Sequence, residues 1–254
     1  MDLATIIGLI MAVGAIVSGY TQEGGNLTSV FLIAPMTIVL GGTLGATIIT
    51  TSMRTVMEVP TYLRIALFGQ PRSFEKDIEM LVFLSEKARR EGVLGLEAHL
   101  KSIEEPFFRK ALQLVIDGTE VTALREILEI EIAYIEERHR KGIIFFQKAG
   151  GFAPTMGILG TVLGLIHTLS DTSDASKMAG AIASAFIATL WGVGLANLFL
   201  LPVSDKLRMR HEEEIAHLEL IMEGVIALQT GDNPRNIRTR LSSFISPRYR
   251  VREL

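Results

Sequence analysis

Hydroxyl side chains are the main polar groups inside the long apolar stretches of this sequence. Thr161 and Thr189 each lie within such a stretch, and Asn197 follows in the second of the two. Hydroxyl and amide oxygens are suitable ligands for a hard cation such as sodium, which gives up its water shell at a cost in free energy. A cation crossing these stretches would therefore find oxygen ligands on its way. The other hydroxyls at depth are Thr43, Thr47 and Thr155.

No acidic residue lies in the middle of any long apolar stretch. Asp2, Asp171 and Asp205 stand only at the edges of these stretches. Ion-driven membrane proteins commonly place a carboxylate inside the membrane, because an ionisable group there is rare and functional. If ions cross this chain, we therefore expect a second polypeptide to supply the ionisable group.

Residues for enzyme catalysis or metal binding do not come together in the sequence. The histidines in the charged segments lack the i, i+4 pairing and third ligand of a zinc site. The chain has no cysteine, which excludes disulfides, thiolate metal sites and cysteine nucleophiles. A net charge of −3 without a basic stripe argues against a nucleic-acid binder. We expect neither an enzyme nor a bound cofactor. The histidines concerned are His99, His139, His211 and His217.

Four apolar segments are long enough to cross a membrane, for which a helix needs roughly 20 mostly apolar residues. The chain combines 48% hydrophobic residues and a mean hydropathy of +0.36 with 21% charged residues, and the charge is segregated outside these segments. Buried helices of a soluble protein are the alternative, but such helices rarely lack a polar face. The expected spans are Leu3–Tyr20, about Val30–Thr50, about Ile143–Leu169 and about Met178–Val203.

Basic residues indicate the side of the membrane that each connection faces. Nearly all of them lie in two blocks, Arg54–Lys141 and Lys206–Arg252. Lys and Arg close to span ends favour the cytoplasmic side, so both termini are expected in the cytoplasm and the short connections 21–29 and 170–177 outside. We therefore expect an all-α, multi-pass inner-membrane protein. Its expected parts are spans 1 and 2 in 1–50, a cytoplasmic helical domain in 51–142, spans 3 and 4 in 143–203, and cytoplasmic C-terminal helices in 204–254.

The cytoplasmic segments also have helical patterns. A charged pattern from Thr122 runs directly into the third span, and Asp205–Gln229 continues the fourth span in the same way. Ser73 fits the N-cap of a helix, and Asn233 with Pro234 fits the N-cap and first position of a short terminal helix.

Small residues recur at helical spacing in the spans. Gly157, Thr161 and Gly164 share a face of the third span, and Thr189 and Gly192 share a face of the fourth. Such stripes let helix backbones approach closely, which is the ordinary basis of helix packing in lipid. The alternative is a surface that faces a partner helix or an ion path.

Two prolines accompany the hydroxyls in these spans. Pro154 lies in the third span and Pro202 lies at the end of the fourth. Proline removes a backbone hydrogen bond and kinks or ends a helix. Each proline is therefore either a simple kink or stop, or a pivot that joins a span to its cytoplasmic extension.

Three motifs resemble the flagellar stator A subunit of the MotA/PomA family, and the resemblance covers essentially the whole chain. They are ARREGVLGLE at Ala88–Glu97, AGGFAPTMGILGTVLGLI at Ala149–Ile166 and ATLWGVGLANLFLLPVSDKL at Ala188–Leu207. In that family these segments are a charged cytoplasmic loop, the third span, and the fourth span with its stalk.

The resemblance implies an ion-conducting stator subunit of the bacterial flagellar motor. In the family, a ring of five A subunits surrounds two B subunits, and each B subunit carries an ion-binding aspartate on one membrane helix. Ion flow turns the ring, which engages the switch protein of the rotor. The implied rotor-facing charges are Arg89, Arg90 and Glu97, and the implied coupling prolines are Pro154 and Pro202.

The resemblance also bears on the transported ion. Thr161 and Thr189 fall where sodium-driven members carry hydroxyls along the ion route, whereas Ala188 replaces a second threonine that these members often have. The threonines favour Na⁺, and Ala188 leaves H⁺ open. A TolQ/ExbB-type energiser of the cell envelope is the alternative function, although such proteins typically have three spans. A non-conducting membrane scaffold is a third possibility.

Overall fold

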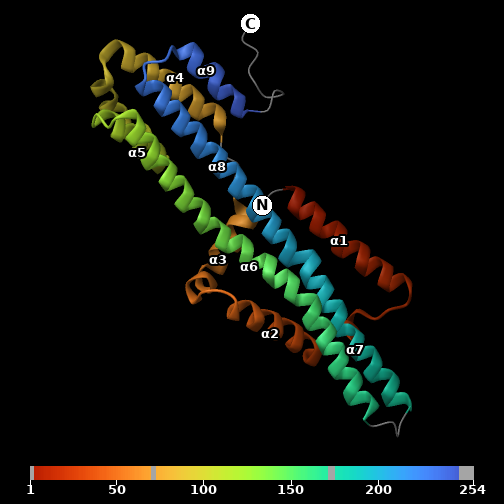
Figure 1. Cartoon of the computed structure of the whole chain (residues 1–254). Coiled ribbons are helices and arrows are strands. Elements are labelled where there is room, and N and C mark those ends of the chain that lie inside the picture. The colour runs from red at the N-terminus through yellow and green to blue at the C-terminus, as the bar shows by residue number, and fades with distance from the viewer. Residues whose placement is uncertain (1–2, 70–72, 171–174, 246–254) are drawn as a thin grey trace. The chain divides into compact units, whose positions relative to one another are not determined.

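The computed structural model describes residues 3–69, 73–170 and 175–245, which form helices joined by short connections (Figure 1). The chain forms two compact units. Unit 1 comprises Met1–Gln70 and His139–Met209, and unit 2 comprises Pro71–Arg138 and Arg210–Leu254. The expected all-α fold is confirmed. The expected outer connection at 170–177 lies largely outside the described residues.

The long apolar helices lie mainly in unit 1. Among the described residues, three continuous helices are long and apolar enough to cross a membrane: α1 (Leu3–Gln22), α6 (Val121–Leu169) and the helix from Met178 to Gln229. The expected extension of the third and fourth spans into charged helices is confirmed, because α6 and the Met178–Gln229 helix each run through both an apolar and a charged segment.

The second expected span is shorter than the sequence indicated. The helix α2 (Ile33–Ile49) has 17 residues, about 25 Å of rise, which is at the lower limit for a membrane span. Of its expected first residues, Val30 instead ends a 3₁₀ turn, η1 (Leu27–Val30), and residues 31–32 connect this turn to α2. Asn26 caps this turn, since its side chain accepts a hydrogen bond from the Thr28 N–H.

Unit 1 has its own apolar core, to which the middle of α6 contributes. Tyr62 and Ala66 of α3 (Met53–Phe68) pack there with Phe146 of α6 and with Leu200. The buried Ser204 hydroxyl donates a 3.0 Å hydrogen bond to the carbonyl of Ile143. This bond ties the start of α8 (Leu201–Gln229) to α6.

Unit 2 is a helical cluster built on part of α6 and part of α8. Around them lie α4 (Phe74–Glu91), η2 (Val93–Ser102), α5 (Pro106–Ile116), α9 (Pro234–Leu241) and η4 (Ser242–Phe244). Its core consists of large side chains that are fully buried; they include Leu81, Phe108, Leu124, Leu220 and Leu241.

The predicted helix starts in unit 2 are confirmed in position. The Asn233 side chain accepts a hydrogen bond from the Arg235 N–H, and Pro234 occupies the first turn of α9. Ser73 is the N-cap residue of α4, but its side chain makes no capping hydrogen bond. The first turn of α4 is instead favoured by Glu75 and Asp77, because negative charge stabilises the positive end of the helix dipole.

The chain remains helical through both prolines, so the interpretation of Pro202 as a helix stop is wrong. The helix α7 (Ala175–Leu195) leads into a π-helical segment, η3 (Ala196–Leu200), and then directly into α8. In this segment the Leu201 N–H bonds to the carbonyl of Ala196, five residues earlier. Pro202 has no N–H and its ring crowds the preceding turn, and the wider π turn accommodates it.

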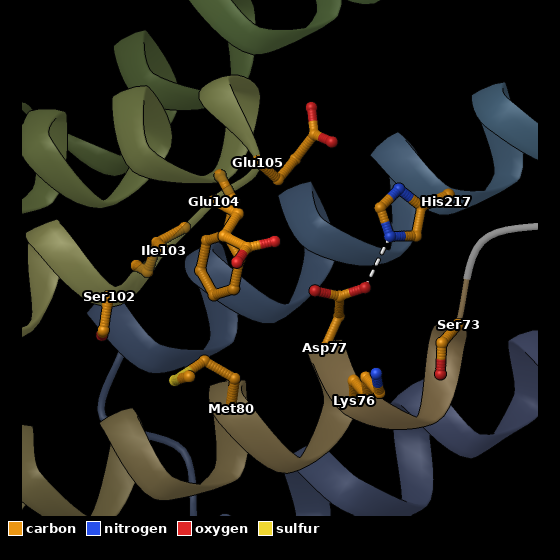
Figure 2. Close-up of a pocket in the computed structure, with 10 residues that line it drawn as sticks. Ser73, Lys76, Asp77, Met80, Ser102, Ile103, Glu104, Glu105 and His217 are labelled. Atoms are coloured by element: carbon orange, nitrogen blue, oxygen red, sulfur yellow. Dashed lines mark hydrogen bonds and ion pairs between the residues drawn. The ribbon is translucent and has the colours of Figure 1, made fainter.

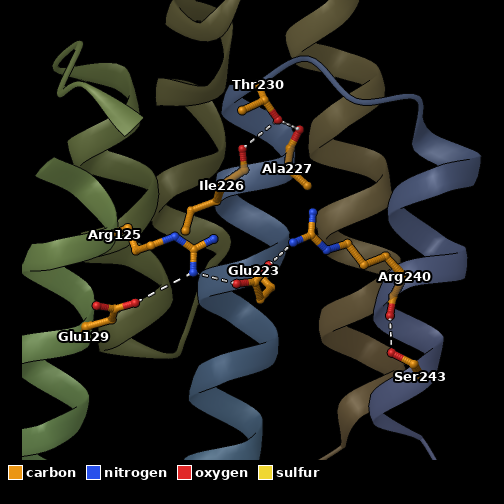
Figure 3. Close-up of polar contacts among 8 residues, drawn as sticks. All are labelled: Arg125, Glu129, Glu223, Ile226, Ala227, Thr230, Arg240 and Ser243. Atoms are coloured by element: carbon orange, nitrogen blue, oxygen red, sulfur yellow. Dashed lines mark hydrogen bonds and ion pairs between the residues drawn. The ribbon is translucent and has the colours of Figure 1, made fainter. Parts of the chain in front are cut away.

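Glu223 joins three helices of unit 2 (Figure 3). One carboxylate oxygen accepts a 2.8 Å hydrogen bond from Arg125 of α6, and the other accepts one from Arg240 of α9. The Glu223 side chain is only 18% exposed. Its hydrogen bond to the Arg125 guanidinium raises the pKa of that arginine. Glu223 is therefore the polar anchor of α9.

We expect Glu223→Gln to loosen α9. The amide can accept a hydrogen bond from one arginine but places its own NH₂ group against the other, at a cost of about 1–2 kcal/mol. Hydrogen exchange of the α9 amides in the full-length chain should accelerate roughly 5- to 30-fold. Glu129→Gln is the matched control, since Glu129 lies 3.8 Å from Arg125 and is 56% exposed. Unchanged exchange in Glu223→Gln would contradict the anchoring role.

Candidate functional site

Thr161 of α6 and Thr189 of α7 face each other, with 2.5 Å between their hydroxyl oxygens. The Thr161 oxygen also lies 2.9 Å from the carbonyl of Ala185 and 3.1 Å from that of Gly157. A hydroxyl has one proton and two lone pairs. Because Thr161 gives its proton to one of these carbonyls, Thr189 must donate the proton between the two hydroxyls. The lone pairs of Thr189 therefore remain available for a further ligand.

The close approach of α6 and α7 depends on glycine. A Cβ atom on Gly192 would lie 2.6 Å from the carbonyl oxygen of Ala153 and 3.0 Å from the Cα of Gly157. A Cβ on Gly157 would in turn lie 2.9 Å from the carbonyl oxygen of Ala188. The backbones of the two helices are therefore in direct contact, as Figure 1 shows for the α6–α7 pair. The helix-packing interpretation of these stripes is confirmed.

Two of the other hydroxyls at depth bond to their own helices, whereas the buried Thr43 hydroxyl has no hydrogen-bond partner among the described residues. Thr47 donates to the carbonyl of Thr43 at 2.7 Å, and Thr155 donates to that of Phe152 at 2.8 Å. The amide of Asn197 likewise donates to Val193, one turn earlier. Of the threonines that the sequence singled out, Thr161 and Thr189 alone form a hydroxyl pair between two helices in the described part of the chain.

In unit 1, the helix turn before Pro154 contacts the residue before Pro202. Pro154 cannot donate to Gly150, the residue one turn earlier in α6. A Cβ atom on Gly150 would lie 2.5 Å from the side chain of Leu201, the residue before Pro202. The backbone discontinuities in α6 and in the η3–α8 junction are therefore adjacent, although their role in coupling remains a prediction.

The expected rotor-facing charges lie in unit 2. Arg89 and Arg90 occupy the last turn of α4, and Glu97 lies in η2; all three are exposed. Gly92 separates them and has a φ of +79°, which glycine adopts without strain. Nearby, the Lys87 ammonium donates a hydrogen bond to Glu91 and lowers the pKa of that carboxyl.

Unit 2 also contains a pocket of about 540 Å³ beside His217 (Figure 2). His217 is buried, and its Nε2 atom lies 2.6 Å from a carboxylate oxygen of Asp77. Glu104 and Glu105 also line the pocket. Within the residues that the structure describes, no group of three or more His, Asp or Glu residues is arranged to hold a metal ion.

Two structural features of the site were not predicted. The carbonyl of Ala185 contacts the Thr161 hydroxyl, and its position one turn before Thr189 on the same helix face is the only sequence signal for it. The π-helical segment η3 has no sequence signal beyond the proline that follows it.

The long apolar helices, two of which pack closely around a hydroxyl pair, are those of a membrane protein. Residues 99–220 match the MotA/TolQ/ExbB proton channel family, and residues 6–92 match the N-terminal region of motility protein A.

Full-length relatives agree with this match. Motility protein A of Borreliella burgdorferi is 38% identical over 98% of this chain and 96% of its own. Chemotaxis protein PomA of Vibrio alginolyticus is 32% identical over 100% and 99%. A chain in the structure of the flagellar MotAB stator complex from Bacillus subtilis superposes with a TM-score of 0.90 at 31% identity, over 96% of both chains.

The chain belongs to the MotA/TolQ/ExbB proton channel family, and within it to the flagellar stator subunits of the MotA/PomA type. It is therefore a multi-pass membrane protein and a channel subunit, not an enzyme.

We expect Gly192→Ala to separate α6 from α7. The added methyl group meets backbone atoms that cannot turn away, and such overpacking costs about 1–3 kcal/mol. Thermal unfolding of the purified chain in detergent, followed by circular dichroism, should give a lower Tm. Gly194→Ala is the matched control, because a Cβ atom there has nothing within 4 Å. An equal Tm for both variants would show that the glycine contact does not hold the helix pair together.

Proposed function

We propose that the chain forms, with a B-type subunit, an ion-conducting complex that turns ion flow into torque on the flagellar rotor. The observation that carries this proposal is the hydroxyl pair of Thr161 and Thr189 between apolar helices that lack an acidic partner for it. The described residues of α1, α2 and α7, and residues 142–169 of α6, contain no Asp or Glu. A B-type subunit with a membrane carboxylate would complete the site.

The proposed topology has four spans, with both termini and the region 51–142 in the cytoplasm. The three long apolar helices and the shorter α2 support the span count. The blocks of basic residues around Arg54 and Lys206 support the orientation. In this arrangement, 1–50 and 143–203 lie in the membrane, and 204–254 is cytoplasmic.

The proposed assembly is a homopentamer around two B-type subunits. This stoichiometry rests on the resemblance to the MotA/PomA family. The exposure of α1 supports assembly in lipid, because none of its described residues is buried within the chain. Its apolar side chains need lipid or another subunit to cover them.

The proposed transported ion is Na⁺, with H⁺ as the alternative. The lone pairs of Thr189 support a cation ligand, because hard cations prefer oxygen. Ala188 is buried against Gly160, on which a Cβ atom would lie 2.8 Å from that of Ala188. A threonine at 188 would crowd this contact, which accounts for the missing second hydroxyl without excluding Na⁺.

The TolQ/ExbB-type energiser, which the sequence alone left open, belongs to the same channel family. The match of residues 6–92 to the N-terminal region of motility protein A favours the flagellar function. We further propose that Arg89, Arg90 and Glu97 contact the rotor's switch protein, and that Pro154 and Pro202 couple ion passage to movement of the cytoplasmic helices.

We expect Thr161→Ala to abolish sodium-driven rotation, because it removes an oxygen and the acceptor that orients Thr189. The measurement is the rotation speed of tethered cells against external sodium at fixed pH. The cells should lack their own stators and express the chain with its B-type partner. Thr161→Ser keeps the hydroxyl and should retain sodium dependence.

Two outcomes would contradict this assignment. A wild-type speed that does not respond to sodium but follows the proton gradient would exclude Na⁺ as the ion. Equal sodium dependence in wild type and Thr161→Ala would reduce Thr161 to a packing residue.

We expect Arg90→Glu to lower torque at high load while leaving the chain in the membrane. Exposed charge pairs contribute only about 0–1 kcal/mol each, so the speed should fall rather than vanish. Arg90→Lys keeps the charge and serves as the control. An opposite charge change on the switch protein should restore part of the torque. Loss of the Arg90→Glu chain from the membrane would indicate a structural role for Arg90 instead.

A further inference from the structure

A small hollow of about 100 Å³ lies in unit 1, where α2 ends and the apolar part of α6 begins. Two lysines of α6, Lys141 and Lys148, line it. They are seven residues apart, which is about two helical turns, so both side chains extend from the same face of α6. None of the other lining residues carries a charge; they are Thr47, Thr50 and Thr51 at the end of α2, and Ile144 and Phe145 of α6.

Lys148 lies within an apolar segment and has no counter-charge there. It is the only Lys, Arg, Asp or Glu in residues 142–169. Its ammonium donates a single hydrogen bond, of 3.3 Å, to the carbonyl of Thr50, although an ammonium has three N–H donors. An ionisable group in an apolar span ordinarily has a partner, and the described residues provide no carboxylate for Lys148.

Two further donors at the hollow are available to a ligand. Lys141 forms no hydrogen bond or ion pair with any described residue, and the same is true of the Thr51 hydroxyl. The hydroxyls of Thr47 and Thr50 are not available in this way, because each donates to a carbonyl of α2. Two ammonium groups and one hydroxyl can therefore donate to the same bound group.

The carbonyl oxygens at the end of α2 do not oppose an anion in the hollow, because they are already bonded. The Thr47 carbonyl accepts hydrogen bonds from the N–H and the hydroxyl of Thr50. The Ile48 carbonyl accepts one from the Thr51 N–H, and the Thr50 carbonyl accepts one from Lys148. These bonds use the acceptors through which the end of a helix otherwise attracts cations and repels anions.

The size and position of the hollow limit what can occupy it. Because one water takes up about 30 Å³, the hollow holds roughly three waters or one small oxyanion. A helix with its side chains is about 10 Å across and cannot enter it. The hollow also lies at the ends of two apolar segments, which is the level at which a bilayer places its phosphate groups.

We propose that this hollow binds a phosphate group, held by the ammonium groups of Lys141 and Lys148 and by the Thr51 hydroxyl. A phosphate accepts several charge-assisted hydrogen bonds at once, and lysine binds it as a point charge. The phosphate belongs either to the headgroup of an acidic phospholipid or to free phosphate, since the chemistry of recognition is the same for both.

Two substitutions test the site. Lys148→Gln and Lys141→Gln each remove one charge and should weaken binding about fivefold, which corresponds to about 1 kcal/mol for one lysine near a phosphate. Because no described residue bonds to Lys141, the second change leaves the contacts of the fold intact. Arg54→Gln is the matched control and should leave binding unchanged. Arg54 is a basic residue shortly after α2, but it does not line the hollow, its side chain is 86% exposed, and it pairs with Glu58.

The measurements use the full-length chain in complex with its B-type subunit, purified in detergent and stripped of lipid. In one arm, native mass spectrometry measures the binding of phosphatidylglycerol, and phosphatidylcholine, which has no net charge, is the comparison. In the other arm, the ³¹P NMR line width of inorganic phosphate measures the binding of the free anion. Binding that depends on the two lysines in the first arm identifies a headgroup as the source, and in the second arm it identifies free phosphate.

Two results would overturn the proposal. Equal weakening by Arg54→Gln and by the lysine variants would show a general attraction of anions to basic residues instead of a defined site. Binding of neither phosphatidylglycerol nor inorganic phosphate to the wild-type complex would also exclude the site, and would leave a carboxylate of a neighbouring subunit as the partner of the lysines. Binding is measured without ion flow, so its failure is distinguishable from failure of the proposed conduction.

Discussion

The direct backbone contact between α6 and α7 is the constraint on which the rest of unit 1 depends. Gly157 and Gly192 bring the two helices together because neither carries a side chain at the contact. Only at this separation can the hydroxyls of Thr161 and Thr189 meet at 2.5 Å. In lipid the hydrophobic effect does not drive helices together, because apolar side chains are already in an apolar solvent. Close van der Waals packing of this kind is therefore the main source of helix association. The helix contact and the hydroxyl pair therefore lie in the same interface, the α6–α7 seam formed by Gly157, Thr161, Thr189 and Gly192.

That seam also limits what the chain can do alone. Its hydroxyl oxygens have lone pairs that can bind a cation, but it contains no carboxylate whose negative charge could balance that of the cation. In this member of the channel family, the α6–α7 seam thus provides one side of an ion site but not the ionisable group that would complete it. Both helices of this seam lead out of the apolar region: α6 continues into unit 2 as one helix, and α7 continues through η3 into α8, which also enters unit 2. Any movement of the seam therefore has a covalent route out of the apolar region.

Sequence patterns predicted the helices well and their interruptions poorly. The helical class, the continuation of α6 into its charged segment and the cap at Asn233 follow from local chemistry. The hydroxyls at Thr161 and Thr189 were identified because polar groups are rare in apolar stretches, yet their pairing depends on tertiary contact. Pro202 was interpreted in part as a possible stop, because a proline in isolation cannot reveal that the preceding turn widens to receive it.

The widened turn at Ala196–Leu200 has a geometric consequence for every residue beyond it. An α-helix turns by about 100° per residue, so one additional residue in a turn shifts the phase of all later side chains by that angle. The face that Thr189 and Gly192 define on α7 does not continue along α8 at the spacing of an unbroken helix. Ser204, Leu207 and the residues after them point in directions set by the π turn. The orientation of the stalk residues is therefore encoded in the backbone of a five-residue segment.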